Sequence, residues 1–163
     1  MPGGGGAVAS SNDLTRARFV VRVGSLSMQV QARAAIVEVM RSAIVQEVGR
    51  NADMACAIGP LPADVERRVR GGGVRLYALE GGISALRRWS VATQLSVRAE
   101  VSLVLMSEPG HAIVGSLSGA ATAADQRPTG DVEAFAQRLE ERAIGGAVRG
   151  ALNNLRTSLV ATR

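Results

Sequence analysis

The sequence predicts an α+β fold of two layers, in which a mixed, mainly antiparallel sheet of about five strands is backed by two long helices and one short helix. Alternation of apolar and polar residues, which is typical of strands, runs from residue 74 to 124. Apolar residues recur at helical spacing on either side of it, at 25–48 and 131–159. We expect a disordered Gly/Ser-rich lead-in at 1–15 and a single domain at 16–163.

The first ordered elements are predicted to be a strand and a helix. Apolar and arginine side chains alternate over 16–23, which indicates a half-buried strand with its arginines in solvent. Gly24 and Ser25 are predicted to end this strand. Ser25 or Ser27 is then expected to cap a helix that reaches about residue 48.

A short strand and a short helix are predicted next. The apolar run 54–58 indicates a buried strand that ends at Gly59 and Pro60. At 62–70, acidic residues precede arginines, an order that suits the dipole of a short helix. Three glycines follow at 71–73. They come after a helix and before a strand, the reverse of the order in a phosphate-binding loop, so we expect no phosphate site in this turn.

The first strand of the alternating region is predicted at 74–88. Gly81 and Gly82 are expected to allow a bulge or bend within it. The strand is predicted to end in a turn, and this turn would carry Trp89.

The second strand of this region shows the clearest periodicity in the chain. Its odd-numbered residues from 91 to 105 form one face, predicted to be buried, while most even-numbered residues are polar and predicted to face solvent. Pro109 and Gly110 predict a type II turn. The chain is then expected to return in a third strand at 113–121.

A long helix is predicted after a polar loop at 124–130. Asp131 is expected to cap it, and an apolar line continues to Leu159. The two adjacent glycines, Gly145 and Gly146, are expected to allow a kink. They also belong to a ridge of small residues that would let the helix lie close to a sheet or a second helix. The other members of the ridge are Ala143, Ala147, Gly150 and Ala151.

The positive charge of the chain comes from arginine alone. The formal net charge is +5, and the sequence contains no lysine. The codon bias of a GC-rich genome explains this composition more simply than a selected polyanion site does. The alternative that stays open is a nucleic-acid or polyanion-binding domain that uses Arg16, Arg18, Arg22 or the arginines of the last helix. Aromatic residues make up only 2% of the chain, which leaves few platforms for base stacking and disfavours nucleic acid as a partner.

Residue types that catalysis and metal binding require are scarce. His111 is the only histidine and lies beside a predicted turn, while Cys56 is the only cysteine and lies among apolar residues. Cys56 is therefore predicted to be a small buried hydrophobe. The acidic residues show no metal-ligand spacing. We predict no catalytic residue, no cofactor and no metal; a small-molecule-binding or enzymatic domain with an unrecognised pocket is a further alternative.

Two groups of arginines are candidate interfaces. Arg87 and Arg88 precede Trp89, and a large aromatic residue beside two guanidinium groups has the composition of a binding hot spot. An equal alternative is that Trp89 folds over the sheet edge as a lid on the core. The second group recurs every seventh residue along the last helix: Arg142, Arg149 and Arg156. For this group a solvated outer face is favoured over a binding stripe.

Three short segments resemble a group of bacterial envelope domains. Residues 72–86, GGVRLYALEGGISAL, are similar to the strand that reads yvLeGsIt in curli-secretion channel subunits and in lipoprotein activators of penicillin-binding proteins. Residues 115–122, GSLSGAAT, and 147–155, AVRGALNNL, resemble a later strand and the closing helix of this group. The amino-terminal domain of TolB has a related layout. The domain that follows HEAT repeats in myxobacterial proteins is a closer likeness, and the resemblance covers about 16–160.

The resemblance implies a cell-envelope adaptor that binds protein and is not an enzyme. We therefore predict a non-enzymatic protein-binding or assembly module, an accessory of a bacterial envelope system, whose partner is another protein or a copy of itself. No apolar stretch is long enough for a transmembrane helix. Residues 1–15 show no signal peptide or lipid-acceptor cysteine, so a chain complete as given would be cytoplasmic, whereas the resemblance predicts the envelope or periplasm.

Overall fold

The computed structural model describes residue 14 and residues 16–161, and it confirms the predicted α+β class. Five strands form one mixed sheet in the order β2-β1-β3-β4-β5. The strands are β1 (Phe19–Met28), β2 (Met54–Ala57), β3 (Arg75–Val91), β4 (Gln94–Glu108) and β5 (Ala112–Gln126). β1 pairs in parallel with β2 and β3, and β4 pairs antiparallel with β3 and β5. The lead-in predicted at 1–15 lies outside the described residues except for Leu14.

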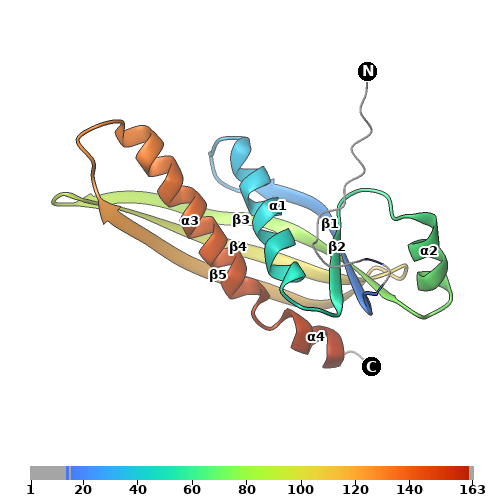
Figure 1. Ribbon diagram of the computed structural model, residues 1–163. Coiled ribbons are helices and arrows are strands. Elements are labelled where there is room, and N and C mark those ends of the chain that lie inside the picture. The colour runs from blue at the N-terminus through green and yellow to red at the C-terminus, as the bar shows by residue number, and fades with distance from the viewer. Residues whose placement is uncertain (1–13, 15, 162–163) are drawn as a thin grey trace, which may run out of the picture.

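The helices of the described part are α1 (Ala35–Gly49), α2 (Ala63–Arg70), α3 (Val132–Leu152) and α4 (Leu155–Ala161). α1 and α3 lie across the same face of the sheet (Figure 1), and the main core fills the space between these layers. On the opposite face a smaller apolar cluster joins Val65 of α2 to Val20 of β1 and Ala55 of β2. Among the described residues, none of these helices has the length and apolar character that a bilayer span requires.

β1 is longer than predicted, and α1 begins later. The prediction that Gly24 and Ser25 end the strand is wrong, because a register shift in the pairing of β1 with β3 absorbs them and the strand continues to Met28. Ser27 therefore lies in the strand, and α1 begins at Ala35 without a side-chain cap. The apolar face of the helix is confirmed by its buried residues: Ile36, Met40, Ile44 and Val48.

The hairpin of β3 and β4 turns later than predicted. β3 stays paired with β4 as far as Val91, so Trp89 lies inside a strand and not in a turn. The chain reverses just beyond, where Ala92 has a φ of 52°. Val91 is consequently 63% exposed and is not part of the buried face. The predicted buried face is confirmed over 95–105, where the odd-numbered side chains of β4 are buried. The prediction that the even-numbered residues face solvent is wrong for Ser96, which is 7% exposed and pairs with Trp89.

The prediction of a type II turn between β4 and β5 is wrong. The peptide bond between Glu108 and Pro109 is cis, and the positive φ of 52° belongs to His111 instead of Gly110. β5 also continues to Gln126, so the first residues of the predicted loop at 124–130 belong to the strand. Residues 124–126 stay in the strand because they are paired with β4 as far as Gln94, which is the first residue of β4.

α3 packs closely on β5 because both surfaces lack bulk. A Cβ atom on Gly119 would lie 2.1 Å from the carbonyl oxygen of Ala147 and 2.4 Å from the backbone nitrogen of Ala151. A Cβ atom on Gly146 would lie 2.8 Å from the side chain of Ala121. The predicted ridge of small residues therefore brings the helix against the sheet.

The last helical region begins as predicted but is divided. The Oδ1 atom of Asp131 accepts a hydrogen bond from the backbone N–H of Ala134 at 3.1 Å, which caps α3. α3 then runs without a break through the glycines at 145–146 and ends before Asn153. The interruption falls at two asparagines, whose short amide side chains compete with helical hydrogen bonding, and α4 follows.

Candidate functional site

The sheet has one face under α1 and α3 and another that these helices leave open. Alternate residues of a strand point to opposite faces, and residues paired directly across two strands share a face. The buried odd-numbered side chains of β4 therefore mark the helix-covered side. The other side of β3, β4 and β5 is here called the outer face. Within the described part, the small cluster under α2 lies over β1 and β2 and reaches only the start of β3, at Leu76.

An exposed aromatic residue lies on the outer face at the hairpin end of β3. Trp89 is 41% exposed and pairs across the ladder with Ser96, which in turn pairs with Ala124 of β5. In the neighbouring row, Arg87 pairs with Arg98. Trp89 thus points away from the helices and is not a lid on the main core. The Trp89 patch, as defined here, consists of Arg87, Trp89, Val91, Arg98 and Ala124, while Ser96 between them is buried.

The predicted patch of Arg87, Arg88 and Trp89 is divided between the two faces. Arg88 lies on the helix side, where its guanidinium donates to Glu140 at 2.7 Å and to Glu133 at 3.1 Å. These hydrogen bonds, with Glu133 the stronger influence, hold the pKa of Arg88 above its usual value. Arg33 also donates to the buried Glu140, at 3.3 Å. Arg88 therefore joins β3 to α3.

The arginines of the predicted stripe on the last helix each meet an acidic residue from another segment. The distances are 3.7 Å from Arg142 to Asp125, 3.2 Å from Arg149 to Glu47 and 3.1 Å from Arg156 to Asp53. These contacts partly neutralise the stripe and reduce the support for polyanion binding through it. An interface role for these three arginines stays a prediction.

The residues with reactive side chains lie apart from one another. Cys56 is fully buried, and burial raises the pKa of its thiol to about 12, so it stays protonated at neutral pH. His111 is exposed in the turn before β5. Among residue 14 and residues 16–161, no group of three or more His, Cys, Asp or Glu side chains is arranged to hold a metal ion.

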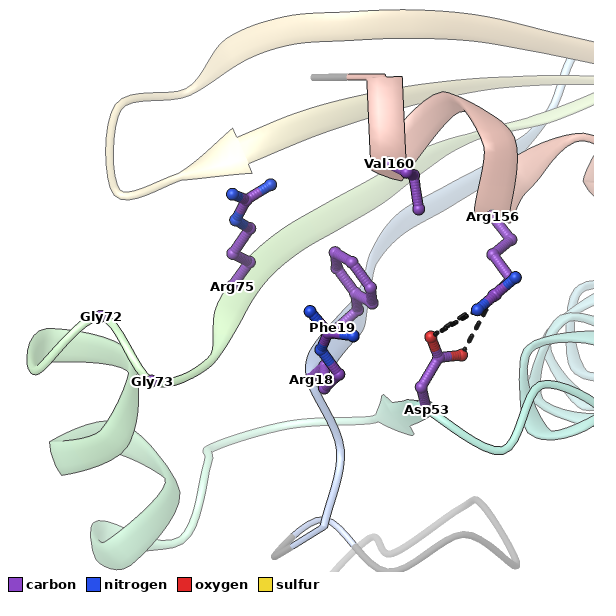
Figure 2. A pocket seen from close by; sticks show the side chains of 8 residues that line it. All are labelled: Arg18, Phe19, Asp53, Gly72, Gly73, Arg75, Arg156 and Val160. Carbon is purple, nitrogen blue, oxygen red and sulfur yellow. Dashed lines mark hydrogen bonds and ion pairs between the residues drawn. The ribbon is translucent and has the colours of Figure 1, made fainter. Parts of the chain in front are cut away.

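The glycine turn at 71–73 uses its backbone N–H groups within α2. These groups donate to the carbonyl oxygens of Arg67, Val69 and Arg68 at 2.9 to 3.1 Å. The turn is therefore not a phosphate-binding loop, as its position after a helix predicts. A cavity of about 610 Å³ nevertheless lies beside it (Figure 2). It is lined by Arg18, Phe19, Asp53, Gly72, Gly73, Arg75, Arg156 and Val160.

The sequence matches no protein-family model and no curated protein sequence. Several solved structures share its fold. The PelC dodecamer from Paraburkholderia phytofirmans is 16% identical with a TM-score of 0.56, over 86% of this chain and 88% of that one. A minor lipoprotein from Acinetobacter baumannii is 12% identical with a TM-score of 0.52, over 85% and 92%. A DUF330 protein from Xanthomonas campestris is 10% identical with a TM-score of 0.53, over 96% and 97%.

At these identities the likeness shows the fold alone. The chain shares its fold with a bacterial lipoprotein, which agrees with the resemblance at the level of the fold. The finer resemblance, to curli-secretion subunits, activators of penicillin-binding proteins and TolB, is not confirmed by these neighbours.

Proposed function

We propose that the protein is a non-enzymatic assembly module of a bacterial cell envelope, and that it associates with further copies of itself through the outer face of its sheet. The observation that carries this proposal is the Trp89 patch, which places an exposed indole ring and two guanidinium groups on a face that α1 and α3 do not cover. Exposed tryptophan and arginine side chains are enriched among the residues that dominate binding energy in interfaces.

The edge of the sheet offers a second surface for self-association, next to the outer face. β5 is an edge strand of 15 residues with one charged side chain, Asp125, and with one irregularity in its pairing, between Ile113 and Gly115, so that 115–126 are regularly paired. Soluble proteins usually protect such edges with charges, bulges or short length, because unpaired backbone groups recruit further strands. The β5 strand of a second copy could pair antiparallel with this edge, and a twofold axis would then relate the two copies. The PelC dodecamer, which shares this fold, supports self-association as a use of it.

Replacement of Trp89 by alanine is expected to weaken self-association by about tenfold or more, because a central aromatic contact is lost. Light scattering after gel filtration, over a series of concentrations, compares the wild-type mass with the monomer mass of 16.9 kDa. Ala120→Lys, which puts a charge on the exposed side of β5, should weaken association as well. Val160→Ala is the matched control, since Val160 is 45% exposed but lies on α4. A wild-type protein that stays monomeric at every concentration would overturn the proposal.

The envelope part of the proposal has a separate test. Fractionation of the cells that produce the protein, followed by immunodetection of the full gene product, should recover it with membrane or periplasmic markers. Recovery with cytosolic markers alone would contradict this location, and it would leave the association test unaffected.

A further inference from the structure

We propose that residues 84–91 of β3 pair antiparallel with residues 84–91 of a second copy, about a twofold axis at Arg88. This stretch is an open edge inside the sheet, because β1 pairs with β3 only as far as Met28 and Ile83. β3 continues beyond that point to Val91, paired with β4 alone. The inference rests on the proposed self-association and specifies its geometry.

The β1 side of residues 84–91 has no strand beside it within the described part of the chain. Figure 1 shows β3 and β4 continuing, at the left of the picture, beyond the end of β1. The N–H group of Gln29 donates to the carbonyl oxygen of Ile83 at 3.0 Å, where the pairing with β1 ends. A cavity of about 250 Å³ then lies between the loop residues 31–33 and residues 86–88. The loop therefore does not take the place of a strand.

The direction of the backbone groups along this edge follows from the neighbouring strands. The N–H group of Arg127 donates to the carbonyl oxygen of Thr93 at 2.8 Å, so Thr93 points its carbonyl toward β5. Successive residues point their backbone groups to alternate sides of a strand. Gln94 therefore points toward β3, where it pairs with Val91. Alternate residues back from Val91 also bond β4, and the residues between them point to the open edge: Leu86, Arg88 and Ser90.

A twofold axis at Arg88 brings all of these backbone groups together. Two antiparallel strands exchange hydrogen bonds between residues whose groups face each other. With Arg88 opposite Arg88 of the second copy, Leu86 lies opposite Ser90 on both sides of the axis. Because the strands run in opposite directions, the rest of each copy lies beyond the β3–β4 turn of the other. The β1 strands therefore do not obstruct the contact.

The side chains of the outer face are complementary in this register. Residues directly opposite each other share a face, so Arg87 lies beside Trp89 of the second copy and Ala85 beside its Val91. Among the described residues, Arg87 has no ion-pair partner. Trp89 and Val91 are 41% and 63% exposed. A guanidinium group over an indole ring is a favourable contact, and Val91 gains an apolar neighbour.

On the helix side, the pairing places two like charges opposite each other. Each Arg88 guanidinium donates to Glu140 at 2.7 Å and to Glu133 at 3.1 Å within its own copy. Each arginine thus brings two carboxylates to the contact, so the two guanidinium groups do not meet as unopposed charges. The other opposed residues on this side, Leu86 and Ser90, are uncharged.

Cysteine variants test the register. Ala85 and Val91 of the second copy form a pair without mutual hydrogen bonds, whose Cα atoms lie about 4.5 Å apart, a distance that a disulfide spans. The double variant Ala85→Cys/Val91→Cys should form a covalent dimer under mild oxidation, seen on a non-reducing gel. Each single variant should form none, since equivalent residues of the two copies lie roughly 20 Å apart, whereas a mixture of the single variants should form it again. Cys56 is fully buried and does not compete.

A proline at position 90 tests the backbone pairing. The N–H group of Ser90 points away from β4, so Ser90→Pro removes a donor that only the dimer uses. The twofold axis repeats this loss, and the dissociation constant should rise by about tenfold or more. Ser90→Ala keeps the N–H group and should associate as the wild-type protein does. Light scattering over a series of concentrations measures the mass, and circular dichroism verifies that each variant is folded.

The edge pairing and the self-association fail separately in these experiments. The pairing is overturned, and the proposed function stands, if the wild-type protein associates but the double cysteine variant crosslinks no more than the single variants do. Association of folded Ser90→Pro at the wild-type dissociation constant would overturn the pairing as well. If Ser90→Pro does not fold, the cysteine variants decide. A protein that is monomeric at every concentration overturns both proposals.

Discussion

Replacing Gly119 with alanine is expected to lower the free energy of unfolding by about 3 kcal/mol, although the change adds a single methyl group. The added Cβ would lie 2.1 Å from the carbonyl oxygen of Ala147 and 2.4 Å from the backbone nitrogen of Ala151. Both contacts are with the backbone of α3, which cannot rotate away as a side chain can. The helix must therefore withdraw from β5, and its buried residues lose contact with the sheet.

The matched control for this prediction is Gly115→Ala. Gly115 lies on the same strand and the same face, but a Cβ atom there would meet nothing within 4 Å. Its substitution is expected to change stability by less than about 1 kcal/mol, because the alanine also restricts the unfolded chain. Urea unfolding followed by circular dichroism measures both variants. Equal stability of the two variants would contradict the close approach of α3 and β5.

The sequence was sufficient to predict those parts of the fold that depend on the pattern of neighbouring residues alone. The alternation over 95–105 was sufficient to place the buried face of β4, because one of its faces meets the helices. The limits of strands depend instead on a partner strand. Gly24 and Ser25 have the composition of a strand end, yet pairing with β3 keeps the chain extended through them. Trp89 likewise remains in a strand because β4 continues opposite to it.

The candidate sites were less predictable because their residues meet across long distances in the sequence. Arg88 and Trp89 are neighbours in the chain, but a strand sends them to opposite faces, and the partners of Arg88 are 45 and 52 residues away. The cavity beside the glycine turn draws side chains from both ends of the chain. The sequence did not mark Arg75 as a residue of this cavity, because an arginine is an ordinary residue in a strand that has one face in solvent.

Replacing Glu140 with alanine is expected to lower the free energy of unfolding by about 2 kcal/mol. Glu140 is 8% exposed and accepts hydrogen bonds from Arg88 of β3 and from Arg33, which precedes α1. The loss of its carboxylate leaves two arginine side chains in a partly buried place with less opposing charge. The effect should be smaller than for a fully buried pair, because these arginine side chains are 37% and 39% exposed and Arg88 keeps Glu133.

The adjacent Glu141 supplies the control for this prediction, because it has the same chemistry and helix but an exposed position. Glu141→Ala should stay within about 0.5 kcal/mol of the wild-type protein. Glu140→Gln keeps the shape and one acceptor oxygen, so its stability should fall between those of Glu140→Ala and the wild type. Urea unfolding at low and high salt tests the cause, since screening should narrow the difference between Glu140→Gln and the wild type. If Glu140→Ala and Glu141→Ala unfold at the same urea concentration, the ion pairs of Glu140 do not hold α3 to β3.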